Sequence, residues 1–210
     1  MNTRRSGRER KKGKEGKVRY DIRLAGSGGQ GIITMGIILA DAIGLHEGKY
    51  VAQTQSYGPE ARGGSSRAEV VVSDEEIDYP KAMELDLLLV MNQKSCDEYY
   101  RDLKPGGTFI VDSTFVTQFP VPEVFAVPFT RIARERLKRE TVANMVALGA
   151  LSQLTGIVSK GSLEKAVLSR MPKETEALNR EALRAGVAAA KRIGRDHALS
   201  QGIVWENEDL

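Results

Sequence analysis

The chain has 210 residues, of which 41% are hydrophobic and 28% charged, and its formal net charge is only +3. This combination excludes an intrinsically disordered chain, and the single cysteine excludes a disulfide scaffold, a cysteine-rich zinc module and an iron–sulfur cluster held by this chain alone. No apolar stretch approaches the roughly 18 residues of a membrane helix, and no secretory signal pattern is present, so we expect a cytoplasmic protein without a membrane partner.

The first 17 residues differ in charge from the rest of the chain. They hold eight basic and two acidic residues, which leaves 23 basic and 26 acidic residues for 18–210. We expect 1–17 to be a disordered basic tail, because it has almost nothing apolar to bury. A nucleic-acid-binding arm is the functional alternative, but no aromatic residues interleave with the charges, which favours a solvated extension with no nucleic-acid partner.

Strands alternate with helices after this tail, which predicts a single α/β domain over 18–195. The predicted elements of its first half are a strand over 20–25, a buried helix over 30–44, a strand from 50 to 52, a polar loop over 53–66 and a strand over 67–73. They continue with a strand over 85–91, a helix over 95–103, a turn over 104–107 and a strand over 108–112. The run 85–91 is nearly all apolar, which is typical of a central parallel strand covered on both faces.

Helical spacing predicts three elements in the C-terminal part: one helix over 130–155 and two more over 162–171 and 174–193. The segment 196–210 is predicted to be a mobile tail, in which Trp205 is either an anchor for a partner or a residue that packs on its own domain. The fold class is therefore α/β: a mostly parallel sheet flanked by helices, with C-terminal helices that pack back onto it.

A glycine-rich loop joins the first predicted strand to the first helix. Its sequence, Gly26-Ser27-Gly28-Gly29-Gln30-Gly31, fits the pattern G-x-G-x-x-G, whose free N–H groups at a helix start attract phosphate. A nicotinamide dinucleotide is disfavoured, because no carboxylate follows in the second strand to bind the ribose. Two readings stay open: the glycines let strand and helix pack closely, or they bind another phosphate-bearing ligand.

The segment 54–69 is unusual for a plain loop, since it concentrates hydroxyls, an amide, two arginines and three glycines. Arg62, followed by Gly63 and Gly64, would place a guanidinium beside exposed backbone N–H groups, which suits a carboxylate, a phosphate or an acidic partner. Ordinary surface ion pairs of Arg62 with Glu60 or Glu69 are the structural alternative.

No catalytic or metal-binding constellation is apparent elsewhere in the sequence. His46 and His197 have no partner at ligand spacing, which disfavours a metal site. Lys94 could lower the pKa of Cys96, but without a nearby histidine a catalytic thiol is disfavoured.

Five segments together closely resemble the gamma subunit of 2-oxoacid:ferredoxin oxidoreductases: Gly26–Thr34, Thr54–Glu69, Ser73–Pro80, Lys104–Asp112 and Asn144–Gly149. The resemblance spans about residues 20 to 190. The combination of SYGPEARGG with IDYP is most similar to the 2-oxoglutarate type, the 2-oxoglutarate synthases, ahead of the branched-chain and pyruvate enzymes.

This resemblance implies a small Rossmann-like subunit of a multi-subunit enzyme that converts a 2-oxoacid and coenzyme A to acyl-coenzyme A and CO2. It implies alpha, beta and delta partner subunits that supply thiamine diphosphate, Mg and iron–sulfur clusters, and electron transfer to ferredoxin through the complex. It further implies a phosphate-receptive loop and a segment that faces the partner or coenzyme A. The loop comprises Gly26, Ser27, Gly28, Gly29, Gln30, Gly31 and Thr34, and the facing segment comprises Ser56, Tyr57, Arg62, Gly63 and Gly64.

We expect this chain to hold no cofactor by itself and to supply no nucleophile, acid or base. Whether the isolated chain forms a homodimer is left open. Two other classes compete: a stand-alone nicotinamide-dependent dehydrogenase, supported by the glycine loop alone, and a nucleotide- or nucleic-acid-binding module, supported by the basic tail alone.

Overall fold

A computed structural model describes residues 19–57, 64–119 and 123–200, with side chains described up to residue 194. The predicted basic tail, Arg62, Gly63 and Trp205 lie outside these residues. None of the helices in the described part combines the length and apolar character that a membrane span requires.

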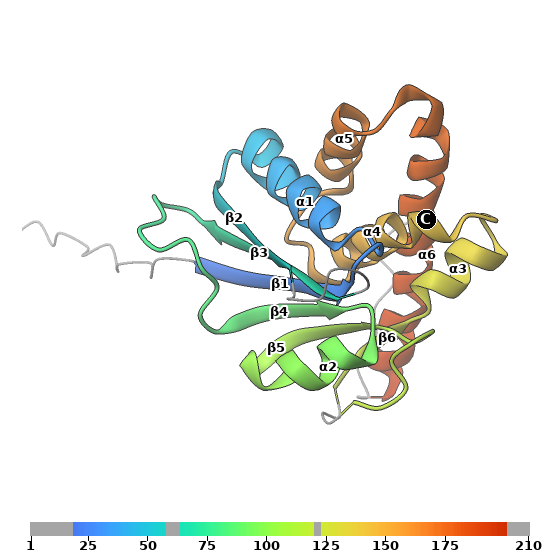
Figure 1. Cartoon of the computed structure of the whole chain (residues 1–210), viewed down its shortest axis with the longest axis horizontal. Coiled ribbons are helices and arrows are strands. Elements are labelled where there is room, and N and C mark those ends of the chain that lie inside the picture. The colour runs from blue at the N-terminus through green and yellow to red at the C-terminus, as the bar shows by residue number, and fades with distance from the viewer. Residues whose placement is uncertain (1–18, 58–63, 120–122, 201–210) are drawn as a thin grey trace, which may run out of the picture.

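The described chain forms one six-stranded mixed sheet in the order β2-β3-β1-β4-β5-β6 (Figure 1). Its strands are β1 (Arg19–Ser27), β2 (Tyr50–Tyr57), β3 (Ser65–Ser73), β4 (Leu85–Val90), β5 (Leu103–Asp112) and β6 (Phe125–Val127). The pairs β1–β4, β4–β5 and β5–β6 are parallel, whereas β3 is antiparallel to both of its neighbours. Every strand except β3 therefore runs in one direction, which confirms the predicted mostly parallel α/β sheet.

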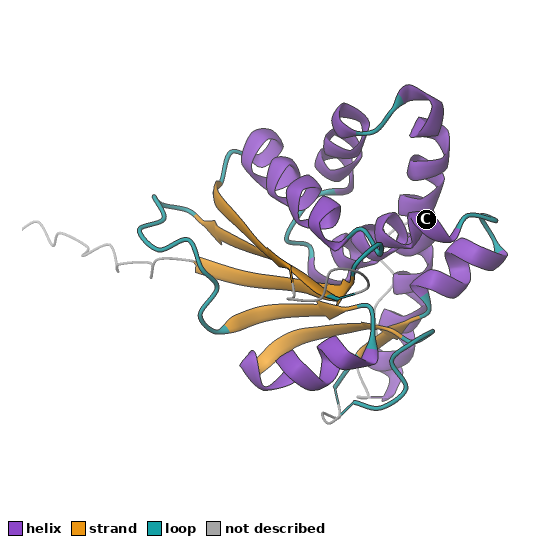
Figure 2. Ribbon diagram, in the orientation of Figure 1, coloured by secondary structure: helices purple, strands orange, loops and turns teal. Residues whose placement is uncertain are grey.

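Helices cover both faces of this sheet, but unequally (Figure 2). On one face a single core cluster joins the sheet to five helices: α1 (Ile32–Glu47), α3 (Phe129–Glu135), α4 (Ala143–Thr155), α5 (Lys160–Arg170) and α6 (Glu176–Ser200). The other face packs against α2 (Gln93–Tyr99), which contributes Cys96 and Tyr99 to a second cluster. Short 3-10 turns complete the described elements: η1 (Tyr100–Asp102), η2 (Glu140–Val142) and η3 (Lys173–Thr175).

Strand β4 shows why the central run of apolar residues is required. Leu87 and Leu89 pack in the cluster of the five-helix face, whereas Leu88 and Val90 pack in the cluster of the α2 face. Successive side chains of a strand point to opposite faces, so a strand covered on both sides is apolar at nearly every position, and in β4 only Asp86 is polar. The sequence-based assignment of 85–91 as a buried parallel strand is confirmed.

The predicted polar loop over 53–66 is wrong at both ends. β2 continues to Tyr57 and β3 begins at Ser65, and the two pair from Tyr50 and Ser73 to Tyr57 and Ser66. Hydroxyl and amide side chains conceal the continuation of β2 beyond residue 52, because β2 lies at an edge of the sheet, where polar side chains are tolerated.

The single helix predicted over 130–155 is also wrong, because two helices and a 3-10 turn occupy this range. Lys138 adopts a left-handed φ of 55°, and the N–H of Arg139 donates to the carbonyl of Ala133 at 3.0 Å. A left-handed residue just beyond the end of a helix is usually glycine. A lysine there gave no signal in the sequence.

Three smaller differences concern element ends. The turn expected over 104–107 forms an irregularity within β5, because the register with β4 shifts there. The cap of α5 is Ser159, whose hydroxyl accepts from the N–H of Ser162 at 3.1 Å. Helix α6 extends to Ser200, five residues beyond the expected domain boundary at 195.

Candidate functional site

The glycine loop forms a tight turn at the carboxyl end of β1. Gly29 and Gly31 have left-handed φ values of 91° and 74°, and Gly31 is the N-cap residue of α1. The side chain of Gln30 fixes the turn: its Oε1 accepts from the N–H of Ser27 at 2.7 Å, and its Nε2 donates to the carbonyl of Met91 at 3.0 Å. The predicted loop is thus fastened to both β1 and the end of β4.

Close packing accounts for some of these glycines. A Cβ at Gly26 would lie 2.6 Å from Gln30 Oε1, and a Cβ at Gly31 would lie 2.3 Å from Asn144 Nδ2. Gly28 and Gly29 are exposed, and nothing lies within 4 Å of a Cβ built on Gly29. The packing interpretation therefore explains the two outer glycines and leaves the exposed tip of the turn open to a ligand.

Helix α1 begins without a cap from any side chain. Gly31 offers no side-chain hydrogen bond, and the first turn contains no acidic residue. The first helical bond of the turn runs from the N–H of Met35 to the carbonyl of Gly31 at 2.9 Å, so the N–H groups of Ile32, Ile33 and Thr34 precede it. Such N–H groups, together with the helix dipole, favour an anion.

A cavity of about 210 Å³ lies beside this turn. It is lined by Gly29, Gln30, Met91, Thr130, Glu140, Thr141 and Ala143. These residues come from the glycine turn, the end of β4, the start of α3, η2 and the start of α4. The cavity is therefore enclosed by the ends of several helices and strands. Its volume suits a phosphate group rather than a whole coenzyme.

The topology explains why a cavity forms at this place. β1 leads through α1 toward β2 on one side of the sheet, and β4 leads through α2 toward β5 on the other. The two helices, α1 and α2, cover opposite faces of the sheet. The connections that leave the carboxyl ends of β1 and β4 therefore run in opposite directions (Figure 1). In open α/β sheets, ligands bind in the crevice at such a switch point.

The second predicted segment reaches the same edge of the sheet. The N–H of Gly28 donates to the carbonyl of Gly64 at 2.8 Å, which joins the glycine turn to the residue before β3. Ser56 and Tyr57 end β2 at this edge, and the Tyr57 side chain is 67% exposed. The structure therefore brings Ser56, Tyr57 and Gly64 toward the glycine turn, while the placement of Arg62 and Gly63 stays a prediction.

Two polar residues of this edge were missed by the sequence analysis. Asp112 at the end of β5 is fully buried, and its carboxylate accepts from the N–H and hydroxyl of Thr130 at 3.1 and 2.5 Å. Asn92 follows β4, and its Nδ2 donates to Ser27 Oγ at 2.5 Å while its Oδ1 caps α2. Both directly follow apolar runs, and a polar residue just after a buried parallel strand was the available signal.

The other candidate residues do not form a reactive site. Burial raises the pKa of the Cys96 thiol to about 11, with a smaller contribution from Asp97. The lowered pKa expected from Lys94 is therefore wrong, and Cys96 stays a thiol at neutral pH. His46 is exposed in the last turn of α1, and the described residues contain no group of three or more His, Cys, Asp or Glu that could hold a metal ion.

The strand beside β1 also differs from that of a dinucleotide-binding fold. The second strand of a classic Rossmann unit lies next to the first and supplies the ribose-binding acid. Here the antiparallel strand β3 lies between β1 and β2, and β2 ends in Ser56 and Tyr57. This arrangement agrees with the sequence argument against a nicotinamide dinucleotide.

The sequence matches the family model described as pyruvate ferredoxin/flavodoxin oxidoreductase over residues 21–189. It is 51% identical over 181 residues to the 2-oxoglutarate synthase subunit KorC of Methanocaldococcus jannaschii, a match that covers 84% of this chain and 97% of the relative.

Two solved structures are similar to the chain. One is the gamma subunit of a keto/oxoacid ferredoxin oxidoreductase from Geobacter sulfurreducens, with 45% identity, a TM-score of 0.76 and coverage of 84% of this chain and 98% of that chain. The other is a 2-oxoglutarate:ferredoxin oxidoreductase from Magnetococcus marinus, solved with 2-oxoglutarate, coenzyme A and succinyl-CoA bound. It shares 30% identity at a TM-score of 0.73, and the match covers 83% of this chain and 31% of that chain.

Proposed function

This chain belongs to the pyruvate ferredoxin/flavodoxin oxidoreductase family, and from that premise we propose that it is the gamma subunit of a 2-oxoglutarate:ferredoxin oxidoreductase. The complex converts 2-oxoglutarate and coenzyme A to acyl-coenzyme A and CO2, and passes two electrons to ferredoxin. The choice of 2-oxoglutarate over a branched-chain oxoacid or pyruvate is supported by the 51% identity to a 2-oxoglutarate synthase subunit.

We assign the cofactors of this reaction to the partner subunits, alpha, beta and delta. An iron–sulfur cluster requires several thiolates, and this chain has one cysteine, which is buried in the α2 face of the sheet. We likewise assign thiamine diphosphate and Mg2+ to the partner subunits. When bound there, thiamine diphosphate supplies the carbanion chemistry of the decarboxylation.

The role proposed for this chain is to form the coenzyme A side of the active-site wall. The observation that carries it is that the exposed glycine turn lines the cavity at the switch point of the sheet and leads directly into the uncapped start of α1. The N–H groups of Ile32, Ile33 and Thr34 would receive a phosphate of the coenzyme. Glu140 also lines the cavity, but its carboxylate is paired with Arg134 at 2.9 Å, which offsets its repulsion of an anion.

The segment 54–69 would complete this wall toward the partner. Tyr57 is exposed at the carboxyl end of β2, and Gly64 is hydrogen-bonded to the glycine turn. Arg62 is proposed to face the coenzyme or an acidic group of the partner, as its sequence neighbourhood suggests. None of these side chains is proposed as a nucleophile, acid or base.

The experiment that tests the phosphate role is Thr34→Glu in the reconstituted complex, with Thr34→Gln as the matched uncharged control. Thr34 is the third residue of α1, where a glutamate can cap the helix start itself. The carboxylate should compete with the phosphate and raise the KM for coenzyme A by roughly 5- to 30-fold, which corresponds to about 1–2 kcal/mol. Thr34→Gln should leave this KM at the wild-type value.

The same substitution should not weaken the fold. An acidic residue in the first turn stabilises a helix by about 0.3–1 kcal/mol, so the free energy of unfolding of Thr34→Glu should equal or exceed that of the wild type. An unchanged KM in an intact Thr34→Glu complex would remove the glycine turn from coenzyme binding. It would leave the assignment as a gamma subunit untouched.

A further inference from the structure

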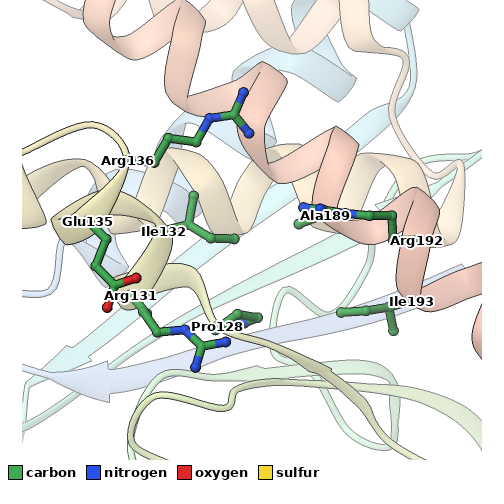
Figure 3. A pocket seen from close by; sticks show the side chains of 8 residues that line it. All are labelled: Pro128, Arg131, Ile132, Glu135, Arg136, Ala189, Arg192 and Ile193. Carbon is green, nitrogen blue, oxygen red and sulfur yellow. The ribbon is translucent and has the colours of Figure 1, made fainter.

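A groove of about 350 Å³ lies between α3 and α6. Pro128, Ile132, Ala189 and Ile193 give it an apolar floor, and the charged residues of its lining are Arg131, Glu135, Arg136 and Arg192. Figure 3 shows the three arginines at separate places around the groove, with Ile132 between Arg131 and Arg136 in this view and Ile193 below Arg192. The guanidinium groups surround the apolar floor and do not converge on one point.

The positive charge of this rim is not compensated within the part of the chain that the structure describes. Arg131, Arg136 and Arg192 form no ion pair there, although Glu135 lies on the same rim. By contrast, Arg134 of the same helix is paired with Glu140. Three like charges gathered around an apolar surface repel one another, so an acidic partner would relieve a cost that the free chain bears.

Helix α3 also connects the groove with the cavity at the switch point. Thr130 lines the cavity, whereas its neighbours Pro128 and Arg131 line the groove. A partner subunit that closes the carboxyl edge of the sheet therefore comes within one helix diameter of the groove, about 10 Å. The groove is a natural extension of the surface that the proposed function assigns to the partner.

We propose that the α3–α6 groove receives an acidic segment of a partner subunit, with an apolar side chain on the floor and carboxylates at the arginine rim. This inference rests on the proposed function, because it presupposes the assembled complex. An apolar floor surrounded by dispersed arginines fits an amphipathic acidic segment better than a compact anion, which would need guanidinium groups that converge. Arginine is also enriched at the centres of protein interfaces.

A photo-cross-linking experiment in the assembled complex identifies the occupant. A photoreactive phenylalanine analogue replaces Ile132 on the groove floor, and the cross-linked peptides are sequenced by mass spectrometry. The expected product joins Ile132 to a partner segment in which acidic residues flank an apolar one. A product with residues 201–210 of this chain, which contain Trp205 and three acidic residues, would overturn the proposal, and so would the absence of any product.

Charge reversal measures the contribution of the rim to assembly. Arg131→Glu combined with Arg136→Glu should raise the Kd of this chain for the remaining subunits by at least about tenfold, as expected for the loss of interface arginines. The matched control is Lys81→Glu with Lys165→Glu, which makes the same charge change at exposed sites outside the groove and should leave the Kd unchanged.

The outcomes separate the two levels of the proposal. Equal binding by the wild type and the Arg131→Glu/Arg136→Glu variant overturns the groove assignment and leaves the gamma-subunit function standing. Failure of the wild type to bind the remaining subunits overturns the proposed function itself. An equal loss of binding in the control would show that net charge matters and not the groove, which also overturns the inference.

Discussion

At the scale of single residues, the site depends on glycines whose roles differ. Gly31 combines a left-handed φ of 74° with a contact in which an added Cβ would lie 2.3 Å from Asn144 Nδ2. Gly48, the C-cap of the same helix, has a similar φ of 70° but nothing within 4 Å of an added Cβ. A side chain at Gly48 would therefore be disfavoured by backbone conformation alone, whereas a side chain at Gly31 would be disfavoured by both conformation and packing.

This contrast predicts different losses of stability for the same substitution. Gly48→Ala should lower the free energy of unfolding by about 1–2 kcal/mol, the cost of a left-handed residue with a Cβ. Gly31→Ala should cost roughly 1–2 kcal/mol more, because Asn144 must move. Urea unfolding measures both, and adding Asn144→Ala to Gly31→Ala should recover part of the difference. Equal losses for the two glycines would contradict the contact with Asn144.

The pKa of Cys96 predicts a pH dependence of stability. Burial raises this pKa from 9.0 to about 11, so the unfolded chain loses the thiol proton first as pH rises. The protonated folded form is thus favoured below pH 9, and its contribution is lost between pH 9 and 11. Two pKa units correspond to roughly 3 kcal/mol. Cys96→Ala should flatten the fall in urea stability over this range, and an unaltered slope would contradict the assignment.

At the scale of elements, α4 and α6 form the most extensive helix–helix contact of the described chain. A Cβ at Gly149 would lie 2.1 Å from the carbonyl oxygen of Leu183, and a Cβ at Gly186 would lie 1.9 Å from that of Val146. Both obstacles are backbone atoms of the facing helix, which cannot rotate away as a side chain can. This crossing holds α6 against the sheet and so fixes one wall of the α3–α6 groove.

Gly186→Ala should therefore push the two helices apart and lower the free energy of unfolding by about 3 kcal/mol or more, as for severe overpacking. The matched control is Gly194→Ala on the same helix, where nothing lies within 4 Å of the added Cβ. Alanine exceeds glycine in helix propensity by about 1 kcal/mol, so this control should stabilise the chain. Thermal unfolding of both variants tests the opposite signs, and two changes of the same sign would refute the crossing.

At the scale of the whole molecule, the surface that we propose to be functional is the carboxyl edge of the sheet. Exposed aromatic side chains occur at both edges, with Tyr57 at the carboxyl end of β2 and Tyr50 at its start, so aromatic exposure does not select an edge. The glycine turn, the cavity and the buried Asp112 all lie at the carboxyl edge and do select it. The order of strands and helices, not any single side chain, brings these parts together.

Much of this arrangement could be predicted from the sequence, because its signals are local. The glycine pattern between a strand and a helix located the turn, and the apolar run 85–91 located the central strand. The parts that failed lack such signals: polar side chains concealed the extension of β2 and β3 into 53–66, and the end of α3 depends on a left-handed Lys138. Local periodicity cannot show which strand will lie beside β1.

The residues that line the candidate site were harder to predict from the sequence, because they come from distant parts of the chain. Thr130 and Ala143 reach the cavity from helices about one hundred residues beyond the glycine turn, so no spacing rule connects them. The pairing of Asp112 with Thr130 likewise depends on the tertiary fold. Resemblance to a known family supplied the expected roles, and packing determined which side chains come together.

We propose that this chain works as one subunit of a thiamine-dependent oxidoreductase, and native co-purification is the decisive experiment. The tagged chain, expressed in its own cells, should be recovered with larger subunits that carry thiamine diphosphate and iron–sulfur clusters. The recovered complex should reduce ferredoxin only when 2-oxoglutarate and coenzyme A are both present. Recovery of a lone chain that oxidises a substrate by itself would contradict the account.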